Sequence, residues 1–366
     1  MKIGILTYHR AENYGALLQS YALLTYLRSL GHDVSFVDYW PKYHSDYFGL
    51  FPWQQMNKRG PLRKMVFFIQ LLIWGIPRYV RKKRLQRFMY EKLELPKEPL
   101  YIDNSCQTEK FDVVIYGSDQ IWRKQNLSGV EFDDWYFGTG NVQTNRKIVY
   151  AGSMGTVATT DADDDYFRDK MKNFDGISVR EKDLQLYLEK LGVSSVLVTD
   201  PVFLLSREHW KNIAKAPSNN EKYILFYNLL NTRESEEFAS KLSKEKGFPV
   251  LEINKRMLLS HLLSKRYIST ASVEEFLGLI EGAEYVISNS FHGVAMSIIF
   301  EKEFYAVGMG AKANRVLTLL DSVGIKDHYI LSQQSHFLSD KIDYDKVRDS
   351  LRELIGEAQR FLLQAL

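Results

Sequence analysis

The chain has 366 residues, of which 45% are apolar and 13% aromatic, and it contains a single cysteine, Cys106. This composition excludes a disordered chain and a disulfide-rich secreted domain, and the length suits two domains better than one. The net charge is only +3 and is unevenly spread, which argues against a general nucleic-acid binder. We interpret Cys106 as an ordinary small apolar residue, because no local motif would activate its thiol.

The first forty residues predict a β-strand, a helix and a second β-strand. Residues 2–7 and 34–38 are apolar runs, and residues 16–30 place apolar side chains at helical spacing up to Gly31. Polar residues directly follow the first run, so the long apolar region of a signal peptide is missing. We therefore expect a cytoplasmic protein.

Apolar strands and helical segments alternate along the rest of the chain. Further strands are expected at 112–116, 147–151, 176–179, 196–199, 223–227, 250–253, 285–287 and 304–307. Helices are expected at 181–191, 207–214, 233–246, 273–281, 294–300, 313–323 and 344–363. The alternation predicts an α/β fold with parallel sheets covered on both faces by helices. A polar stretch at 215–222 separates the expected domains, which are 1–215, 221–340 and a terminal helix, 341–366, packing back on the first domain.

One segment, residues 59–97, departs from this pattern. It has eleven lysines and arginines against two glutamates, a net charge of +9, so the remainder of the chain carries −6. Residues 65–77 are mostly apolar, but this stretch is shorter than the roughly twenty residues that span a bilayer. Two interpretations stay open. Either 63–87 forms a helix lying on an anionic membrane, or a buried apolar helix is followed by a solvated basic one.

A first set of polar residues lies in the turn after the first strand and at the start of the first helix. The candidate ligand-binding residues in this set are His9, Arg10, Asn13, Tyr14 and Gln19. Ligands of open α/β sheets bind at this edge, where a helix N-terminus also offers free N–H groups. Capping of the helix would account for Asn13 but not for the others.

A second set, GSDQIW at 117–122, follows the strand expected at 112–116. The carboxylate of Asp119, the amide of Gln120 and the indole of Trp122 are groups that sugar sites use for directional hydrogen bonds and an apolar ring face. Asp119 could also serve as a base. The alternative is a turn in which Asp119 accepts a hydrogen bond from its own backbone.

A third set combines cations with a histidine. Arg180 follows a short strand and can grip a carboxylate or phosphate, or instead pair with Glu181. His292 lies where a helix begins and is a candidate acid, base or phosphate donor. Lys312 and Arg315 come near the next helix start and could converge on it. Motifs for metals, dinucleotides, Walker loops and nucleophile elbows are missing, so we expect no metal and no cofactor.

In their order along the chain, these motifs resemble the polysaccharide pyruvyl transferase family. The matching pieces are NYGALLQSYAL (13–23), LGHDVSFVDY (30–39), YGSDQIW (116–122), VYAGSMG (149–155), ISVRE (177–181), TDPVFLL (199–205), SNSFHGVAMSIIF (288–300) and NRVLTLLDSVGIKDHYI (314–330). The resemblance implies two Rossmann-like domains facing a central cleft, as in GT-B glycosyltransferases. It also implies transfer of a pyruvyl group from phosphoenolpyruvate to two sugar hydroxyls, giving a cyclic ketal and phosphate.

The resemblance also assigns roles. Arg180, His292 and Lys312 match family residues thought to hold or activate phosphoenolpyruvate, and Arg315 lies close by in the sequence. The motifs of Asn13 and Asp119 match the acceptor side less securely. On this basis we expect the acceptor to contact the first two sets, His9, Arg10, Asn13, Tyr14, Gln19, Asp119, Gln120 and Trp122. Our hypothesis is that His292 is the acid, or stabilises the leaving phosphate, and that Asp119 is the base for the acceptor.

Two other functions remain open. One is a GT-B glycosyltransferase that uses a nucleotide-sugar donor, although we find no acidic ribose-binding pattern in the second domain. The other is a non-catalytic scaffold of polysaccharide synthesis held at the membrane by Arg63–Arg87. If that segment does bind the inner leaflet, a lipid-linked oligosaccharide becomes the expected acceptor.

Overall fold

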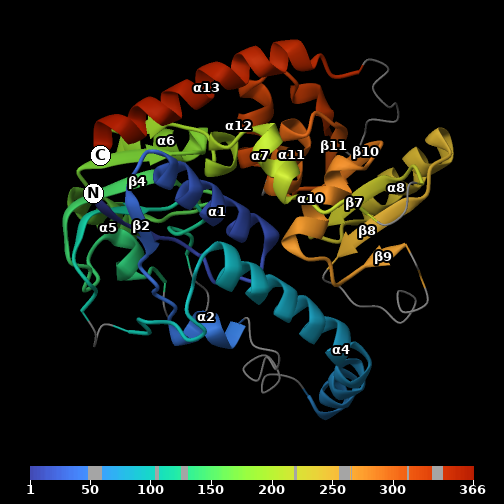
Figure 1. The fold of residues 1–366 in the computed structure, drawn as a ribbon, viewed down its shortest axis with the longest axis horizontal. Coiled ribbons are helices and arrows are strands. Elements are labelled where there is room, and N and C mark those ends of the chain that lie inside the picture. Colours follow the sequence, from blue (N-terminus) through green and yellow to red (C-terminus); the bar gives the residue numbers. More distant parts are fainter. Residues whose placement is uncertain are drawn as a thin grey trace.

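The computed structural model describes residues 1–47, 60–103, 107–124, 131–217, 221–254, 264, 266–310, 313–331 and 341–366. Within them the chain forms two six-stranded parallel sheets with helices around both (Figure 1). The strand orders are β2-β1-β3-β4-β5-β6 and β12-β11-β10-β7-β8-β9. This arrangement of two Rossmann-like halves is GT-B-like and confirms the expected fold class.

The first sheet takes its strands from the first half of the chain. They are β1 (Lys2–Leu6), β2 (Asp33–Phe36), β3 (Phe111–Tyr116), β4 (Thr144–Gly152), β5 (Gly176–Val179) and β6 (Val196–Leu197). The helices of this half are α1 (Tyr14–Ser29), α2 (Lys42–Tyr47), α4 (Pro61–Lys92), α5 (Asp161–Lys170), α6 (Lys182–Lys190) and α7 (Arg207–Ile213), with 3-10 turns η1 (Asp134–Phe137), η2 (Met171–Asn173) and η3 (Pro201–Leu204). The central strand β3 is buried on both faces except at Asp112, as its nearly continuous apolar sequence predicts.

The second sheet begins after residue 222. Its strands are β7 (Ile224–Asn228), β8 (Val250–Asn254), β9 (Tyr267–Ile268), β10 (Tyr285–Ser288), β11 (Glu303–Val307) and β12 (Tyr329–Ile330). Around it lie α8 (Arg233–Lys246), α10 (Val273–Glu281), α11 (Phe291–Ile299), α12 (Asn314–Ser322) and the 3-10 turn η5 (Lys326–His328). The short edge strands β9 and β12 carry too few residues to show a period in the sequence, so only the four longer strands were expected.

The terminal helix α13 (Tyr344–Ala365) runs across both halves (Figure 1). Near its start, the Tyr344 hydroxyl donates to the carbonyl of Lys302 in the second half, at 2.5 Å. Near its end, Phe361 packs beside Tyr150 of β4, with ring centroids 6.4 Å apart. The helix therefore links the two sheets.

Helix α4 corrects one of the two interpretations of the basic segment. It is a single helix that passes through Pro77, and its buried part is the basic half, where Leu85, Phe88 and Met89 recur at helical spacing. In the apolar half, the described side chains include exposed ones such as Met65, at 55% exposure, and Ile76, at 75%. A buried apolar helix followed by a solvated basic helix is therefore wrong. None of the described helices is long and apolar enough to cross a membrane.

Helix α1 forms much of the contact between the halves. Twelve of its sixteen residues are buried. On the side of the second half, the ring of Tyr14 stacks on Phe276 of α10 at 4.4 Å, and its hydroxyl donates to the carbonyl of Ala271 at 2.7 Å. An ion pair of 2.5 Å between Arg84 of α4 and Glu275 of α10 lies beside this contact. The carboxyl edge of the first sheet therefore faces the second half at close range.

Candidate functional site

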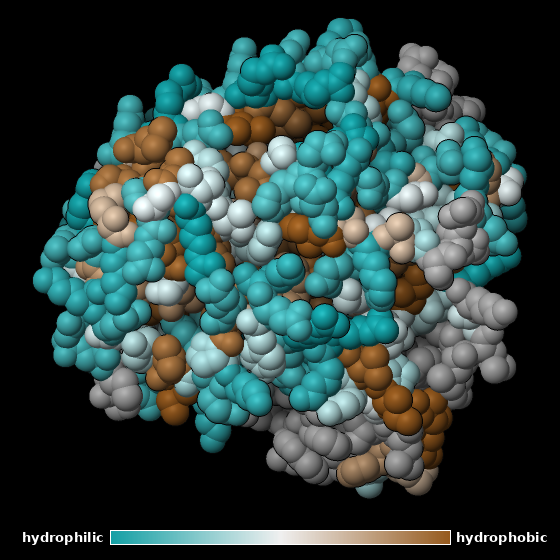
Figure 2. All heavy atoms as spheres, in the orientation of Figure 1, coloured by the Kyte–Doolittle hydropathy of each residue, from teal (hydrophilic) through white to brown (hydrophobic). Residues whose placement is uncertain are grey.

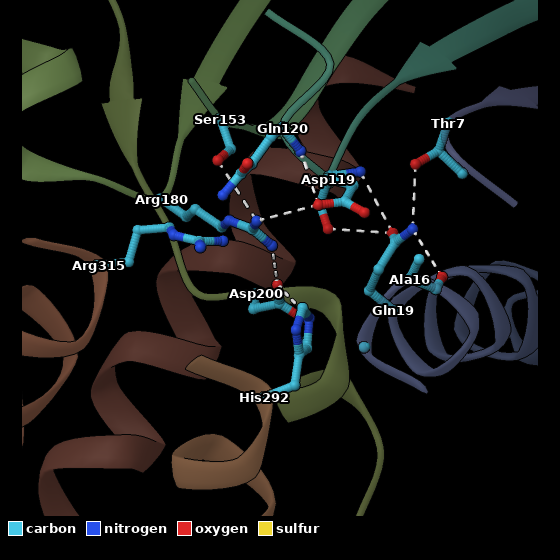
Figure 3. A network of polar contacts seen from close by, with 12 residues as sticks. Thr7, Ala16, Gln19, Asp119, Gln120, Ser153, Arg180, Asp200, His292 and Arg315 are labelled. Atoms are coloured by element: carbon cyan, nitrogen blue, oxygen red, sulfur yellow. Dashed lines mark hydrogen bonds and ion pairs between the residues drawn. The ribbon is translucent and has the colours of Figure 1, made fainter. Parts of the chain in front are cut away.

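Arg180 lies at the centre of a buried polar cluster (Figure 3). It follows β5, its side chain is 1% exposed, and its Nη1 donates to Oδ2 of Asp200. Its Nη2 donates to Oγ of Ser153 at 3.3 Å and lies 3.7 Å from Oδ1 of Asp119. Burial would lower the pKa of Arg180, but the charges of Asp200, Glu181 and Asp119 outweigh burial and raise it. Arg180 therefore remains a cation inside the protein.

Asp200 is the carboxylate that faces Arg180. It precedes η3, where its Oδ1 accepts from the backbone N–H of Val202 at 3.1 Å, as an N-cap residue does. The side chain is fully buried. Burial would raise the pKa of Asp200, but the charge of Arg180 and the nearby His292 lower it to about 2. Asp200 is therefore ionised at neutral pH.

His292 comes from the other half of the molecule, in the first turn of α11. Its Nε2 lies 3.6 Å from Oδ2 of Asp200, on the far side of that carboxylate from Arg180 (Figure 3). The Nδ1 side of the imidazole lies against the start of α1. A Cβ atom on Gly15 would be only 2.0 Å from Nδ1 of His292. The ring is thus held between a glycine of one half and a carboxylate at the junction.

Arg315 approaches the same place from α12. The amide oxygen of Gln120, when turned toward Arg315, lies 3.1 Å from Nη1 and 2.6 Å from Nη2 of the guanidinium. The Nε of Arg315 is 3.9 Å from Oε1 of Glu181. Both guanidinium groups make cation–π contacts with the ring of Phe291. The ring centroid lies 5.2 Å from the guanidinium carbon of Arg180 and 5.6 Å from that of Arg315. Burial, and then repulsion by Arg180, lower the pKa of Arg315.

Three nitrogens of this cluster are buried without a hydrogen-bond partner in the described part of the chain. They are Nε of Arg180, Nε of Arg315 and Nε2 of His292. A buried donor without a partner is costly, on the order of 1–3 kcal/mol, and rare in native proteins. The three atoms come from both halves of the molecule. All three lie near buried carboxylates but beyond hydrogen-bond distance, with Oε1 of Glu181 3.7 and 3.9 Å from the two Nε atoms and Oδ2 of Asp200 3.6 Å from Nε2. Anionic oxygens of a ligand could complete their hydrogen bonds.

Asp119 and Gln120 lie at the edge of the cluster. The Asp119 side chain is 18% exposed, and its Oδ1 accepts from the backbone N–H of Gln120 at 2.7 Å while facing Arg180. Asp119 therefore makes the backbone hydrogen bond expected of a turn residue, and it also forms an ion pair with Arg180. Gln19 of α1 joins this loop to β1, because its Oε1 accepts from Oγ of Ser118 at 3.1 Å and its Nε2 donates to Thr7 at 3.0 Å (Figure 3).

His9 and Arg10 belong to a separate buried network around Asp38. The Nε2 of His9 is 3.0 Å from Oδ1 of Asp38, and Arg10 binds the same carboxylate through Nε at 2.5 Å and Nη2 at 2.7 Å. Burial would raise the pKa of Asp38, but Arg10 and His9 lower it to about 2. Both candidate residues are thus engaged inside the first half, and their acceptor role stays a prediction.

Three further candidates have clear structural partners. Asn13 caps α1 by accepting from the N–H of Gly15 at 2.9 Å. Tyr14 makes the contact with α10 described above. Trp122 is fully buried, and its indole N–H donates to the carbonyl of Tyr136 at 3.0 Å, so its ring face is not accessible in this structure. Lys312 and Cys106 lie outside the described residues.

Asp200, Glu181 and Ser153 are cluster residues to which the sequence argument gave no site role. Glu181 is fully buried, and it accepts from the hydroxyl of Ser153 and from the backbone N–H of Met154 at 3.2 Å. Burial raises the pKa of Glu181 against the opposing charges of Arg180 and Arg315. In the sequence, the feature that could have indicated a site role for Asp200 is the pair Asp200-Pro201 directly after the expected strand at 196–199. This pair is equally typical of a helix N-cap followed by proline.

A pocket of about 220 Å³ opens beside Gln120. Its walls include Arg123, Lys124, Phe132 and Gly155. A larger pocket of about 430 Å³ lies under α13, between η3, α7 and α11, and contains none of the cluster residues. Gln120 lines the smaller pocket and also faces Arg315, so we consider the smaller pocket part of the site. The described residues contain no group of His, Cys, Asp and Glu that could hold a metal ion.

Residues 13–310 match a family model described as polysaccharide pyruvyl transferase. The structure is similar to that of a UDP-GlcNAc 2-epimerase from Methanocaldococcus jannaschii, with 11% identity, coverage of 97% of this chain and 100% of the other, and a TM-score of 0.46. It is also similar to the heptosyltransferase WaaC from E. coli, with 12% identity, coverage of 84% and 87%, and a TM-score of 0.38. No curated protein matched the sequence significantly.

Proposed function

Because the chain belongs to the polysaccharide pyruvyl transferase family, we propose that it transfers a pyruvyl group from phosphoenolpyruvate to two hydroxyls of a sugar in a polysaccharide precursor. The products are a cyclic pyruvate ketal and phosphate. The family is one of transferases that act on polysaccharide. The donor and the ketal are the parts of the reaction that this proposal adds.

The observation that carries the proposal is the set of three unsatisfied nitrogens on Arg180, Arg315 and His292. Phosphoenolpyruvate carries its carboxylate and its phosphate on the same carbon, C2, and forked guanidinium groups bind both kinds of oxygen. Two buried arginines that share the Phe291 ring supply such forks side by side. Lys312 would add a third cation to the donor set.

The residues of the cluster can perform each step of the transfer. A proton goes from His292 to C3 of the donor, and a sugar hydroxyl then attacks C2 and forms the first C–O bond. The C2–O bond to phosphate breaks next, and its electron pair leaves with the phosphate, whose charge Arg180 and Arg315 stabilise. The second hydroxyl adds to C2 and closes the ketal. Asp119 takes up the proton of the first hydroxyl and passes it to the departing phosphate, and the proton of the second hydroxyl replaces the one that His292 gave to C3.

The acceptor would enter on the side of Gln120. Asp119 is the partly exposed carboxylate of the cluster, and the pocket beside Gln120 opens next to it along the same loop. Gln19 supports this loop through Ser118. Of the other candidates, Tyr14 contacts α10 of the second half, whereas His9, Arg10, Asn13 and Trp122 have partners within the first half. We propose no direct contact for the buried Trp122. Pocket shape would select the sugar.

We also propose that the protein works at the inner surface of the cell membrane on a lipid-linked acceptor. The support is the exposed apolar face of α4, made of Met65, Val66, Phe68, Ile69 and Ile76. Figure 2 shows apolar side chains gathered at the lower right edge of the molecule, where α4 lies in Figure 1. Several basic residues of α4 are already paired within the protein, including Lys82 with Glu12 and Arg84 with Glu275, so the apolar face is the stronger candidate for the contact.

Phosphate release tests the proposal. The purified protein is incubated with phosphoenolpyruvate and galactosyl, glucosyl and mannosyl acceptors, and we expect release with at least one of them. The His292→Ala variant should lose about 10²-fold or more in kcat, the usual contribution of a positioned general acid. Turnover within a few-fold of wild type would remove His292 from this role.

Ligand-induced changes in melting temperature distinguish pyruvyl transfer from its main alternative, a glycosyltransferase that uses a nucleotide-sugar donor. Phosphoenolpyruvate at one hundred times its Kd should stabilise the protein by about 2.7 kcal/mol, whereas UDP-sugars should leave the melting temperature unchanged. A melting temperature raised by UDP-sugars alone would favour a glycosyltransferase. No phosphate release with any acceptor and no stabilisation by either donor would favour a scaffold.

A further inference from the structure

The pocket beside Gln120 has two cations in its wall. Among the described residues that line it, Arg123 and Lys124 are cations, Phe132 and Met154 are apolar, and none is an aspartate or a glutamate. Its volume of about 220 Å³ is below the range of about 300–1,000 Å³ of pockets that hold drug-sized ligands. The pocket therefore suits a single sugar residue better than a nucleotide sugar.

One turn of the chain joins this pocket to the buried cluster. The turn is anchored by the fully buried Trp122, and the backbone N–H of Arg123 donates to the carbonyl of Gln120 at 3.1 Å. On one side of the turn, Asp119 and Gln120 face the arginines of the cluster (Figure 3). On the other side, Arg123 and Lys124 line the pocket. A sugar in the pocket therefore lies beside the base of the proposed reaction.

The two cations of the pocket differ in how their charges are balanced. The Nζ of Lys124 lies 3.1 Å from Oδ1 of Asp163 and 3.8 Å from Oε1 of Glu131, so carboxylates of the protein already offset its charge. Arg123 is exposed, and its guanidinium has no ion pair with any residue that the structure describes. Arg123 therefore gives the pocket a positive charge that an anionic group of a ligand would balance.

We propose that this pocket selects an acidic sugar, and that Arg123 is the specificity-determining residue that binds the carboxylate of a uronic acid. This inference rests on the proposed function, because it names the class of acceptor for that same reaction. A guanidinium can bind a carboxylate through two parallel hydrogen bonds, whereas the neutral hydroxymethyl group of an ordinary hexose offers it one uncharged oxygen. In a uronic acid the carboxylate replaces that group at C6, so the ketal closes on two neighbouring ring hydroxyls.

Pairs of acceptors that differ only at C6 test the proposal. They are the 4-nitrophenyl glycosides of glucose, galactose and mannose and those of the three corresponding uronic acids, each assayed by phosphate release from phosphoenolpyruvate. We expect the KM of the acidic member to be about tenfold lower in at least one pair, the lower end of what a hydrogen bond to a charged group contributes. Equal KM values within all three pairs would overturn the proposal.

Arg123→Gln tests the residue itself. The variant should raise the KM of the preferred uronide to that of its neutral partner and leave the KM of the neutral sugar unchanged. Because Arg123 is exposed, salt should screen its charge, and the wild-type preference should shrink between about 0.05 M and 1 M salt. A variant that raises both KM values equally, or that keeps the preference for the acid, would refute the role of Arg123.

Lys241→Gln is the matched control. Lys241 is an exposed cation of α8 in the second half, and its replacement removes the same unit of charge away from the pocket. This variant should keep the wild-type preference for the acidic sugar. If Lys241→Gln abolishes the preference as Arg123→Gln does, the overall charge of the protein is the cause and the proposal fails.

Binding without turnover separates this inference from the proposed reaction. The dissociation constants of the same glycosides are measured by NMR titration of the full-length protein without phosphoenolpyruvate. Tighter binding of a uronide that depends on Arg123, with no phosphate release from any acceptor, would support acid selection and refute only the pyruvyl transfer. Equal binding of acidic and neutral sugars, or no binding of either, would refute acid selection and leave the pyruvyl transfer to be judged by phosphate release.

Discussion

The imidazole of His292 lies directly against the Cα atom of Gly15, although the two residues belong to different halves of the protein. Helix α1 begins at Tyr14, so Gly15 occupies a position where most residues would suit the helix. Only the lack of a side chain allows the ring of His292 to reach Asp200. The position of His292 in the second half therefore requires a glycine at the start of α1.

Gly15→Ala should reduce activity without unfolding the protein. The new Cβ would lie 2.0 Å from Nδ1 of His292, so the ring or the whole of α11 must shift. Overpacking of this kind costs about 1–3 kcal/mol. A misplacement of about 1 Å can cost about 10²-fold in rate. We expect kcat for phosphate release to fall to that extent, with the melting temperature lowered by a few degrees.

Gly356→Ala provides the control for this substitution. Gly356 lies within α13, and nothing lies within 4 Å of the position that its Cβ would take. Alanine there should stabilise the helix by roughly 0.5–1 kcal/mol and leave kcat unchanged. Equal kcat in wild type and Gly15→Ala would show that the close contact with His292 has no functional consequence.

Arg315→Gln should weaken donor binding more than it slows the chemical step. The variant loses the positive charge of the Arg315 guanidinium. Burial and the charge of Arg180 lower the pKa of this group, and the amide oxygen of Gln120 faces both of its terminal nitrogens. Hydrogen bonds to charged groups contribute about 1.5–3 kcal/mol, so the KM for phosphoenolpyruvate should rise by about 10- to 100-fold. Arg352→Gln, on the exposed face of α13, should leave KM unchanged. A KM within twofold of wild type would exclude Arg315 from the donor site.

The sequence was sufficient for the two sheets and for the longer helices. Strands such as β3 and β10 are nearly continuous apolar runs, and hydrophobic periodicity detects them without knowledge of their neighbours. Helix α4 was harder, because Pro77 suggests a break and apolar content suggests burial. The structure instead buries Leu85 and Phe88 of the basic half, which depends on packing against α1.

The site was predictable in its cations but not in their partners. Arg180, His292 and Arg315 stood out because each follows a strand or begins a helix at the ligand-binding edge of a sheet. Asp200 and Glu181 are recognisable only once the two halves meet, since contacts between residues distant in sequence leave no local period. His9 and Arg10 illustrate the reverse case, because Asp38 engages them within one half.

Acid should destabilise the protein through two buried carboxylates. The pKa of Asp38 and that of Asp200 are both lowered from 3.8 to about 2. A carboxylate with a lowered pKa in the folded state stabilises the protein above the unfolded value, and this contribution is lost as pH falls toward the folded value. We expect a loss of about 2 kcal/mol for each group between roughly pH 4 and pH 2. Melting temperatures measured across this range check it.

Asp38→Asn isolates one of the two carboxylates. At pH 7 the variant should be less stable by about 3–5 kcal/mol, because Arg10 remains buried without its partner. Its stability should then fall less steeply than that of wild type between roughly pH 4 and pH 2. Asp33→Asn, which removes an exposed carboxylate from β2, should retain the wild-type acid response. An equally steep fall in Asp38→Asn and wild type would contradict the assignment of Asp38.

Substitution of the apolar face of α4 should detach the protein from membranes without affecting its fold. Ile69 and Ile76 are 49% and 75% exposed and lie seven residues apart on one side of the helix. Burying one such side chain contributes about 1.5–3 kcal/mol, so Ile69→Asp with Ile76→Asp should abolish cosedimentation with phosphatidylglycerol vesicles. Leu186→Asp, at a 52% exposed leucine of α6, should bind as wild type does. Equal binding by all three proteins would refute the proposed contact, and a lowered melting temperature of the double variant would show that the face packs within the protein instead.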